Sequence, residues 1–324
     1  MKNNALVLTA LATALFSVNA SAATQWDLPT AYPDSNFHTE IAMKFVKAVS
    51  DATGGEFKIT VHSNASLFKA PEIKRAVQGN QAQAGEILLS NFANEDPIYE
   101  LDGLPFLATG YEQAWKLYQA QKPYLEKKLE SQGMKLLYSV AWPPQGIYTN
   151  KTLNSIDDMK GLKWRAYSPV TSKIAQEVGA HPVTIQQAEL SQALATGVVD
   201  SYMSSGSTGY DTKTYEYLKK LYDTQAWLPK NALIVNKRAF DALDDKERKA
   251  LLDAAAEAEK TGWTLSQEKT KWYNEQLVKN GVEIVKPSSE LIAGLTKIGE
   301  SMIADWTKKA GADGEKLLND YKSK

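Results

Sequence analysis

The chain has 324 residues, with 37 lysines and arginines against 38 aspartates and glutamates, a formal net charge of −1 and no cysteine. A charge balance this close to zero gives no sign of a nucleic-acid partner or an anionic membrane surface. The absence of cysteine excludes disulfides, thiolate metal sites and cysteine nucleophiles. The length is typical of two domains or one large domain, held together by an apolar core.

The first 22 residues have the pattern of a secretory signal peptide. Lys2 is followed by an apolar stretch over 5–18, and Ala20-Ser21-Ala22 offers the small residues of a cleavage site after Ala22 or Ala23. An apolar stretch of this length is shorter than the roughly 20 residues that a membrane-spanning helix needs. We therefore predict an exported, periplasmic protein whose mature part does not insert into a membrane.

Short strands alternate with helices along most of the mature chain. Strands are predicted at 24–28, 57–62, 84–89, 134–142, 163–166, 182–185 and 199–203. One helix is predicted from a cap at Ser35 or Asn36 to Gly54, and others over 71–79, 111–133, 172–178 and 187–196. This alternation predicts an α/β architecture with largely parallel sheets.

The last third of the chain has a different pattern. Helical periodicity continues from 244 to about 281, so either two helices are fused there or one long helix spans two domains. A strand at 282–285 and one or two further helices complete the chain.

The sequence carries no motif of a hydrolytic, nucleotide-binding or zinc-dependent enzyme. Gly-x-Ser-x-Gly, the phosphate-binding loop and His-Glu-x-x-His are all missing. The three histidines, His38, His62 and His181, are not at metal-ligand spacing. We expect no catalysis, no cofactor and no metal.

Three sequence elements resemble one family. Residues 158–165 read Asp-Met-Lys-Gly-Leu-Lys-Trp-Arg, residues 189–200 follow the pattern Glu-x-x-x-Ala-Leu-x-Thr-Gly-Val-Val-Asp, and 104–106 read Leu-Pro-Phe. Together they resemble the DctP family, the substrate-binding proteins of TRAP (tripartite ATP-independent periplasmic) transporters. The resemblance covers essentially the whole mature chain.

The resemblance implies a two-lobed periplasmic-binding-protein fold with a ligand cleft between the lobes and a long helix spanning both. It implies no catalysis, closure of the lobes on a small carboxylate, and delivery to the membrane permease subunits. We place lobe I at 23–142 plus 231–270 and lobe II at 143–230 plus 271–324. In the family, the arginine at the position of Arg165 pairs with the ligand carboxylate, and its planar fork of donors suits that role.

Two departures from the family pattern narrow the class of ligand that we predict. Many members continue after Gly-Val-Val-Asp with Gly-Gln-Glu-Asn-Pro, whose asparagine helps to bind the carboxylate, whereas Ser204 stands at that position here. Members often carry a second arginine some twenty residues before the first, where this chain has the neutral Gln145. A second ligand carboxylate would lack a partner, so we predict a monocarboxylate.

The expected cleft is rich in aromatic side chains, namely Phe37, Phe92, Trp142, Tyr148, Tyr167, Tyr210 and Trp227. Flat rings suit an apolar or aromatic ligand body, so we predict an aromatic 2-oxo or 2-hydroxy acid or an indole or phenyl acid, with a small aliphatic 2-oxo acid as the alternative. Trp164 points to the face opposite Arg165 and is assigned to the core. The predicted ligand-binding residues are Arg165, Trp142, Gln145, Tyr167, Ser204, Ser205, Phe37, Asn91, Phe92, Gln187 and Tyr210.

Two other classes of function stay open at this point. A periplasmic hydrolase would need a nucleophile and a base, and His38 with Ser204 or Ser205 is the pairing on offer. A receptor that reports its ligand to a sensor has the same sequence features as a transport receptor.

Overall fold

A computed structural model describes residues 23–324 of the chain. The predicted signal peptide at 1–22 lies outside the described residues. Within residues 23–324, none of the helices is long and apolar enough to cross a membrane.

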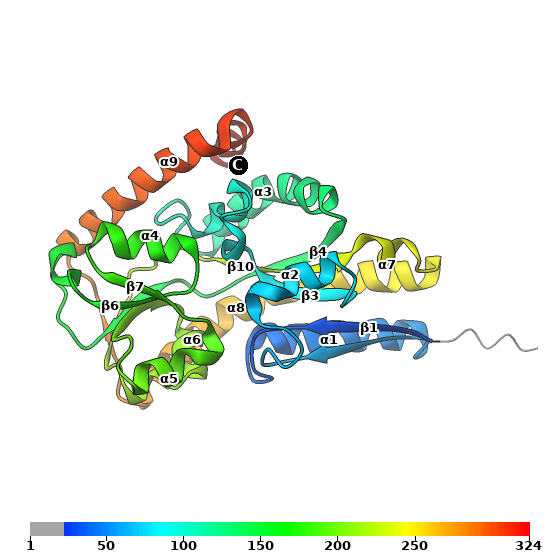
Figure 1. The fold of residues 1–324 in the computed structure, drawn as a ribbon, viewed down its shortest axis with the longest axis horizontal. Helices are drawn as coiled ribbons and strands as arrows, with labels where there is room; N and C mark the ends of the chain where they lie inside the picture. Colours follow the sequence, from blue (N-terminus) through cyan, green and yellow to red (C-terminus); the bar gives the residue numbers. More distant parts are fainter. Residues whose placement is uncertain (1–22) are drawn as a thin grey trace, which may run out of the picture.

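Two small sheets form the part of the molecule that we call lobe I. The first sheet pairs β1 (Thr24–Pro29) with β2 (Phe57–His62) in parallel. The second has the order β3 (Ala84–Leu88), β10 (Lys230–Asn236), β4 (Met134–Ala141) and is antiparallel. The helices of this lobe are α1 (Phe37–Thr53), α2 (Ala70–Gln78), α3 (Tyr111–Ser131) and α7 (Lys237–Asp241) (Figure 1).

A six-stranded sheet forms lobe II. Its order is β11 (Glu283–Val285), β9 (Lys220–Tyr222), β5 (Gly146–Thr149), β8 (Ser201–Ser204), β6 (Lys163–Ala166), β7 (His181–Thr184). Three helices accompany it: α4 (Pro169–Glu177), α5 (Leu190–Ala195) and α6 (Gly206–Asp211). Short 3-10 turns connect many of these elements: η1 (Leu89–Phe92), η2 (Pro97–Tyr99), η3 (Leu101–Gly103), η4 (Ile156–Met159), η5 (Gln187–Glu189) and η6 (Thr214–Glu216).

Three strands, β5, β9 and β10, were not predicted from the sequence, and at β5 and β10 the prediction of largely parallel sheets is wrong. β10 is antiparallel to both β3 and β4, and β5 is antiparallel to both β8 and β9. Parallel neighbours are joined by a helical crossover within one sheet. β5 and β10 are instead the strands by which the chain enters one lobe directly from the other, so no crossover determines their direction.

Helix α1 begins and ends where the sequence predicts. Asn36 caps it by accepting a hydrogen bond from the backbone N–H of His38, and Gly54 ends it in the left-handed conformation. Ile41, Phe45 and Val49 are buried on its inner face.

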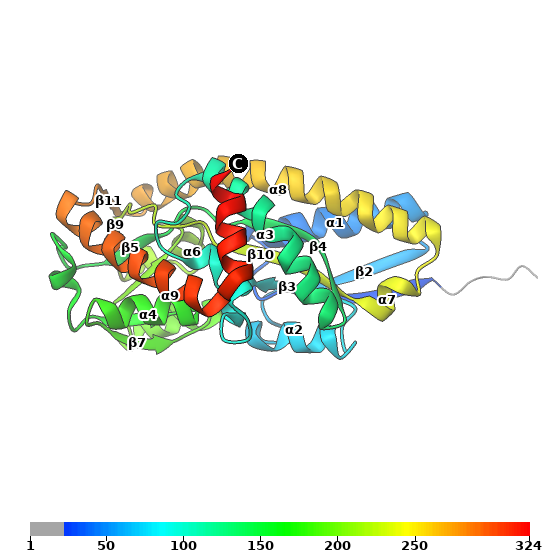
Figure 2. The same cartoon turned by 90° about the horizontal axis from the view of Figure 1, so that it is seen from above.

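One long helix and one kinked helix connect the lobes. α8 (Asp245–Lys279) is a single helix of 35 residues that contacts α1 and β4 in lobe I and α6 and β11 in lobe II (Figure 2). α9 (Ser289–Lys322), kinked at Gly311, contacts η4 of lobe II and α3 of lobe I. The long helix of the sequence prediction is therefore one helix, and it spans both lobes. The predicted lobe boundaries stay predictions.

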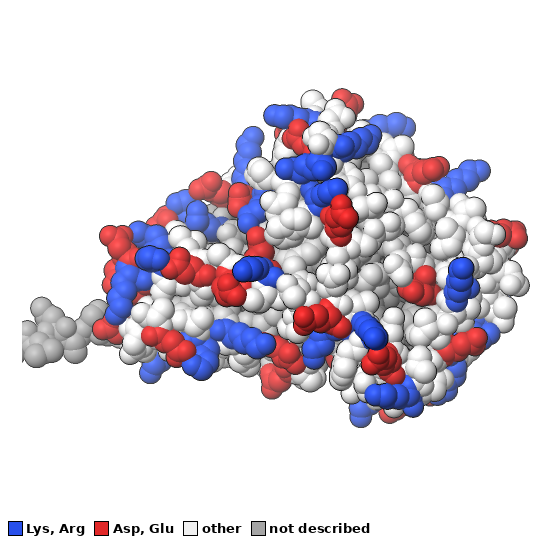
Figure 3. All heavy atoms as spheres, turned by 180° about the vertical axis from the view of Figure 1, so that it is seen from behind, with Lys and Arg blue, Asp and Glu red and all other residues white. Residues whose placement is uncertain are grey.

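The surface carries both charge signs. On the face shown in Figure 3, basic and acidic side chains are intermixed around a broad uncharged area. This face offers no single-sign field that would steer a polyanion.

Candidate functional site

A cavity of about 430 Å³ lies between the two lobes. Its lining includes Tyr32 and Trp142 from lobe I and Arg165 and Tyr167 from lobe II. The lobes also meet beside it, since Val170 of α4 lies against Gly103 of η3. On another side, Asn36 Nδ2 at the start of α1 donates to Asp211 Oδ2 of α6 over 2.7 Å.

Arg165 is a buried cation that faces this cavity. Its side chain, 3% exposed, extends from β6, and its Nε donates to the carbonyl oxygen of Ile185 over 2.8 Å. Among residues 23–324, no carboxylate lies within ion-pair distance of it and its two terminal nitrogens make no hydrogen bond. Burial lowers the pKa of the Arg165 guanidinium to about 10, which still leaves it protonated at neutral pH. A buried charge without a protein partner is the signature of a site for an anion.

The strand that carries Arg165 also explains its orientation. Side chains alternate along β6, so the neighbouring Trp164 points to the other face, where it is fully buried. The core assignment of Trp164 is confirmed. The Arg165 guanidinium carbon lies 5.0 Å from the centre of the Tyr167 ring and 5.9 Å from that of Tyr202. These ring faces stabilise the cation in part but leave its in-plane donors to the cavity.

Trp142 and Tyr32 form the aromatic wall of lobe I. Their rings meet edge to face at 4.9 Å between centres. The Oδ1 atom of Asn231 accepts hydrogen bonds from Trp142 Nε1 at 2.8 Å and from the Tyr32 hydroxyl at 3.4 Å. The two rings are therefore held by one buried amide of β10.

Gln145 is occupied by protein contacts. Its Oε1 accepts from the Tyr167 hydroxyl over 3.1 Å, and its Nε2 donates to the carbonyl of Pro143 over 3.0 Å. Gln145 therefore holds the Tyr167 ring beside Arg165, in addition to lining the cavity.

Eight of the predicted ligand-binding residues line the cavity, and three do not. The eight are Arg165, Trp142, Gln145, Tyr167, Ser204, Ser205, Asn91 and Gln187. Ser204 and Ser205 lie where β8 ends and α6 begins, and the Ser205 hydroxyl caps α6 by accepting from the backbone N–H of Thr208.

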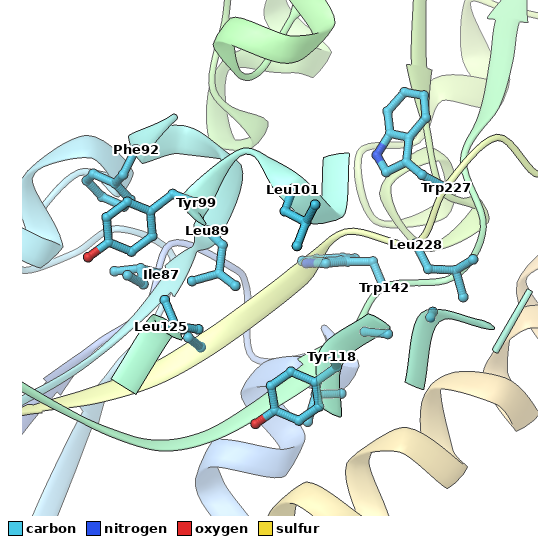
Figure 4. Packing of buried hydrophobic residues seen from close by; sticks show 14 of the residues in the cluster. Ile87, Leu89, Phe92, Tyr99, Leu101, Tyr118, Leu125, Trp142, Trp227 and Leu228 are labelled. Carbon is cyan, nitrogen blue, oxygen red and sulfur yellow. The ribbon is translucent and has the colours of Figure 1, made fainter. Parts of the chain in front are cut away.

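Phe37, Phe92 and Tyr210 pack elsewhere. Phe37 is fully buried behind Trp142, with ring centres 5.5 Å apart. Phe92 lies in the core of lobe I beside Tyr99, at 6.2 Å (Figure 4). The Tyr210 ring packs against that of Trp272 at 5.1 Å. A ligand in this cavity would not contact these three rings.

Sequence reasoning missed several lining residues, among them Tyr32, Lys69, Gln186 and Thr208. Tyr32 follows β1 directly, and a side chain just after the carboxyl end of a parallel strand is a position where ligands commonly bind. Its position after the predicted first strand could therefore have identified Tyr32 as a lining residue. Lys69 lies in an irregular segment before α2, which no pattern places at a cleft.

The structure does not support a hydrolase in which His38 is the base and Ser204 or Ser205 is the nucleophile. His38 is 1% exposed and enclosed by rings, with its centre 4.3 Å from that of Trp142 and 4.1 Å from that of Phe37. Within residues 23–324, it forms no hydrogen bond with Ser204 or Ser205. Burial lowers the pKa of His38 well below its usual range.

Glu86 titrates in the core of lobe I beside the cavity wall. It is 2% exposed and accepts a 2.5 Å hydrogen bond from the Thr30 hydroxyl. Its Oε1 lies 3.6 Å from His38 Nδ1, but the lowered pKa of His38 means that this contact is not an ion pair at neutral pH. Burial raises the pKa of the Glu86 carboxyl to about 7.

The raised pKa predicts how stability depends on pH. In the unfolded chain a glutamate ionises near 4.3, so between about 4.3 and 7 the folded protein keeps a proton that the unfolded chain has lost. The stability that the protonated Glu86 contributes to the fold is therefore fully present below about pH 4.3. It is lost as the pH rises from there to about 7. Glu86→Gln should gain stability relative to wild type as the pH rises from 5 to 8, on the order of 3 kcal/mol. Urea unfolding of both proteins across this range checks this, and a difference that does not change with pH would contradict it.

A molecule with two lobes, a long helix along both, and between them a cavity faced by a buried arginine that meets no carboxylate in residues 23–324 has the features of a solute-binding protein. Residues 30–309 match the model of the DctP family, described as bacterial extracellular solute-binding protein, family 7. The chain belongs to this family. The resemblance noted in the sequence and the predicted two-lobed fold are both confirmed. The family and the structural neighbours are receptors rather than enzymes.

Three relatives illustrate the similarity. The crystal structure of DctP6, an extracytoplasmic solute receptor of Bordetella pertussis binding pyroglutamic acid, is 69% identical, with a TM-score of 0.92 over 93% of this chain and 100% of that one. A TRAP solute-binding protein from a marine metagenome, specific for pyroglutamate, is 44% identical, with a TM-score of 0.91 over 93% of this chain and 99% of that one. The C4-dicarboxylate-binding periplasmic protein DctP of Rhodobacter capsulatus is 30% identical over 226 residues, which are 67% of this chain and 66% of that one.

The relatives bear on the predicted ligand. The chain is a solute-binding protein of the DctP family, and the two solved relatives named above bind pyroglutamate. Pyroglutamate is not aromatic, and the prediction of an aromatic ligand stays unconfirmed.

Proposed function

We propose that this protein is the periplasmic receptor of a TRAP transporter that captures pyroglutamate (5-oxoproline) and delivers it to the membrane permease subunits. The observation that carries the proposal is the buried Arg165, which faces the cavity without a carboxylate partner within residues 23–324. Lys69, the other basic residue in the lining, is exposed, so Arg165 is the buried cation of the cavity and matches one ligand carboxylate. The relative of 69% identity that binds pyroglutamic acid supports the choice among monocarboxylates.

The cavity also suits the body of such a ligand. The ring of pyroglutamate is small and flat, and Trp142, Tyr32 and Tyr167 offer ring faces and edges to it. Gln145 stands where many family members place a second arginine, and its amide is bonded to Tyr167 and Pro143. Accordingly, dicarboxylates such as succinate should bind poorly.

An aromatic monocarboxylate is the second candidate, because the same three rings line the cavity. Thermal shift and calorimetry separate the two, since a ligand that binds only the folded state raises the melting temperature. The panel is pyroglutamate, phenylpyruvate, indole-3-acetate, a small aliphatic 2-oxo acid and succinate. Pyroglutamate should give the largest shift. A larger shift with an aromatic acid, or a response restricted to succinate, would overturn the proposal.

The role in transport needs a test in cells. Deleting the gene should abolish uptake of labelled pyroglutamate at low external concentration. Uptake that survives deletion, together with tight binding by the purified protein, would favour a sensor role instead.

A further inference from the structure

A hydrogen bond between side chains joins the two lobes beside the ligand cavity. Asn36, which precedes α1 of lobe I, donates from Nδ2 to Oδ2 of Asp211, the last residue of α6 in lobe II, over 2.7 Å. The hydroxyl oxygen of Ser207, also on α6, lies 3.4 Å from each of these two atoms. Asn36 is fully buried. Because side chains alone make these contacts, they exist only while the start of α1 and α6 are held together.

The charge of Asp211 strengthens this hydrogen bond. Burial raises the pKa of the Asp211 carboxyl to about 6, although the hydrogen bonds from Asn36 and Ser207 and the nearby Lys269 work in the opposite direction. The carboxylate is therefore mostly ionised at about pH 7.5. A hydrogen bond to an ionised acceptor is roughly twice as strong as one between neutral groups.

Asn36 divides its amide between two tasks. Its Oδ1 accepts from the backbone N–H of His38 and caps α1, while its Nδ2 donates to lobe II. Serine caps a helix about as well as asparagine does, but it has no amide donor and its side chain is shorter. Asn36→Ser therefore removes the contact between the lobes and keeps the helix cap.

The contact lies next to the cavity without taking part in its lining. Tyr32, four residues before Asn36, lines the cavity, and so does Thr208, three residues before Asp211. Asn36 and Asp211 themselves are not among the lining residues. A change in affinity after breaking their hydrogen bond would therefore come from the positions of the lobes and not from a lost contact with the ligand.

We infer that the hydrogen bond between Asn36 and Asp211 is a latch that holds the lobes closed around a bound ligand and sets how fast the ligand leaves. The inference rests on the proposed function for its probe, pyroglutamate. A ligand enclosed between two lobes leaves when the lobes separate, and separation breaks this bond. The ligand enters the open form, in which the bond is absent. The latch therefore lowers the dissociation rate and leaves the association rate unchanged.

The test is a double-mutant cycle of wild type, Asn36→Ser, Asp211→Ala and the double variant. Stopped-flow tryptophan fluorescence with pyroglutamate at about pH 7.5 gives both rate constants, since Trp142 lines the cavity. Asn236→Ser is the matched control. Asn236 caps α7 with its Oδ1 in the same way, but its Nδ2 donates to the carbonyl of Val77 over 2.9 Å, within lobe I. Thermal unfolding without pyroglutamate verifies that each variant folds.

Asn36→Ser should raise the dissociation rate about tenfold without changing the association rate, and Asp211→Ala should do the same. The double variant should dissociate about as fast as either single variant, because each single change already breaks the latch. Asn236→Ser should keep both rate constants of wild type.

Three results would overturn the latch. One is a wild-type dissociation rate in Asn36→Ser, another is a pair of single effects that multiply in the double variant, and the third is a slower association that accounts for the lost affinity. If wild type does not bind pyroglutamate, the proposed function falls by itself. The same cycle is then measured with the acid of the thermal-shift panel that gives the largest shift, so the two conclusions fail separately.

Discussion

Arg165→Ala is expected to abolish binding of the carboxylate ligand while the protein remains folded. The guanidinium is buried, contacts no carboxylate among the described residues, and offers two nitrogens to the cavity. Removing one partner of a buried, hydrogen-bonded charge pair costs about 2–5 kcal/mol, so affinity should fall by roughly 30-fold to several thousand-fold. Without ligand, the alanine variant lacks a buried charge that has no carboxylate partner among the described residues. Its melting temperature should therefore stay close to that of wild type, lowered only by the lost side-chain packing.

Arg165→Lys is the matched comparison. It keeps the positive charge but loses the planar fork and the Nε hydrogen bond to Ile185. Its affinity should lie between those of wild type and Arg165→Ala. Calorimetry of the three proteins with pyroglutamate measures the series. Micromolar binding by the alanine variant would show that the carboxylate is held elsewhere.

Local signals predicted the helices well. The cap at Asn36, the stop at Gly54 and the periodicity from 244 to 281 each depend on residues close in the chain, and α1 and α8 follow them. Strand direction depends instead on how the chain passes between lobes. β5 and β10 were not predicted as strands, and nothing within them indicates that they enter a sheet from the other lobe.

The candidate site was predictable where a motif marked it. The motif at 158–165 located Arg165, and strand alternation separated it correctly from Trp164. Aromatic content was a weaker guide, because an aromatic residue fills a core as readily as it lines a cleft. Trp142 and Tyr167 line the cavity, whereas Phe37 and Phe92 pack in the core and Tyr210 packs against Trp272.

The ligand class was the least predictable feature. Gln145 was interpreted as the absence of a second arginine, but its amide is engaged with Tyr167 and Pro143, and Lys69 and Glu189 bring further charges to the cavity lining. Buried polar atoms without partners become visible only when the partners of every buried polar group are known. That accounting depends on side-chain positions, which residue patterns do not contain.

The largest effect on stability is expected at a fully buried pair where the chain returns to lobe I. Lys230, the first residue of β10, has its Nζ 3.4 Å from Asp102 Oδ2, and its backbone N–H donates to the same oxygen over 2.6 Å. Burial raises the pKa of Asp102 and lowers the pKa of Lys230, while their mutual attraction favours the charged forms. Asp102→Asn keeps an acceptor for the backbone N–H but leaves the ammonium without an anion, and should lower the free energy of unfolding by about 3 kcal/mol or more. Lys230→Met leaves the carboxylate with the backbone donor alone and should also destabilise strongly.

The double variant tests whether this loss comes from the broken pair. Replacing a buried ion pair with neutral groups of similar size is often close to neutral, so Asp102→Asn combined with Lys230→Met should cost less than the sum of the two single changes. Urea unfolding of the four proteins at pH 7 gives the coupling free energy directly, and we expect it to exceed about 1 kcal/mol. Additive losses would mean that each side chain stabilises the fold independently, through packing. A positive coupling would identify the pair as an electrostatic link between η3 and β10, the strand that returns from lobe II.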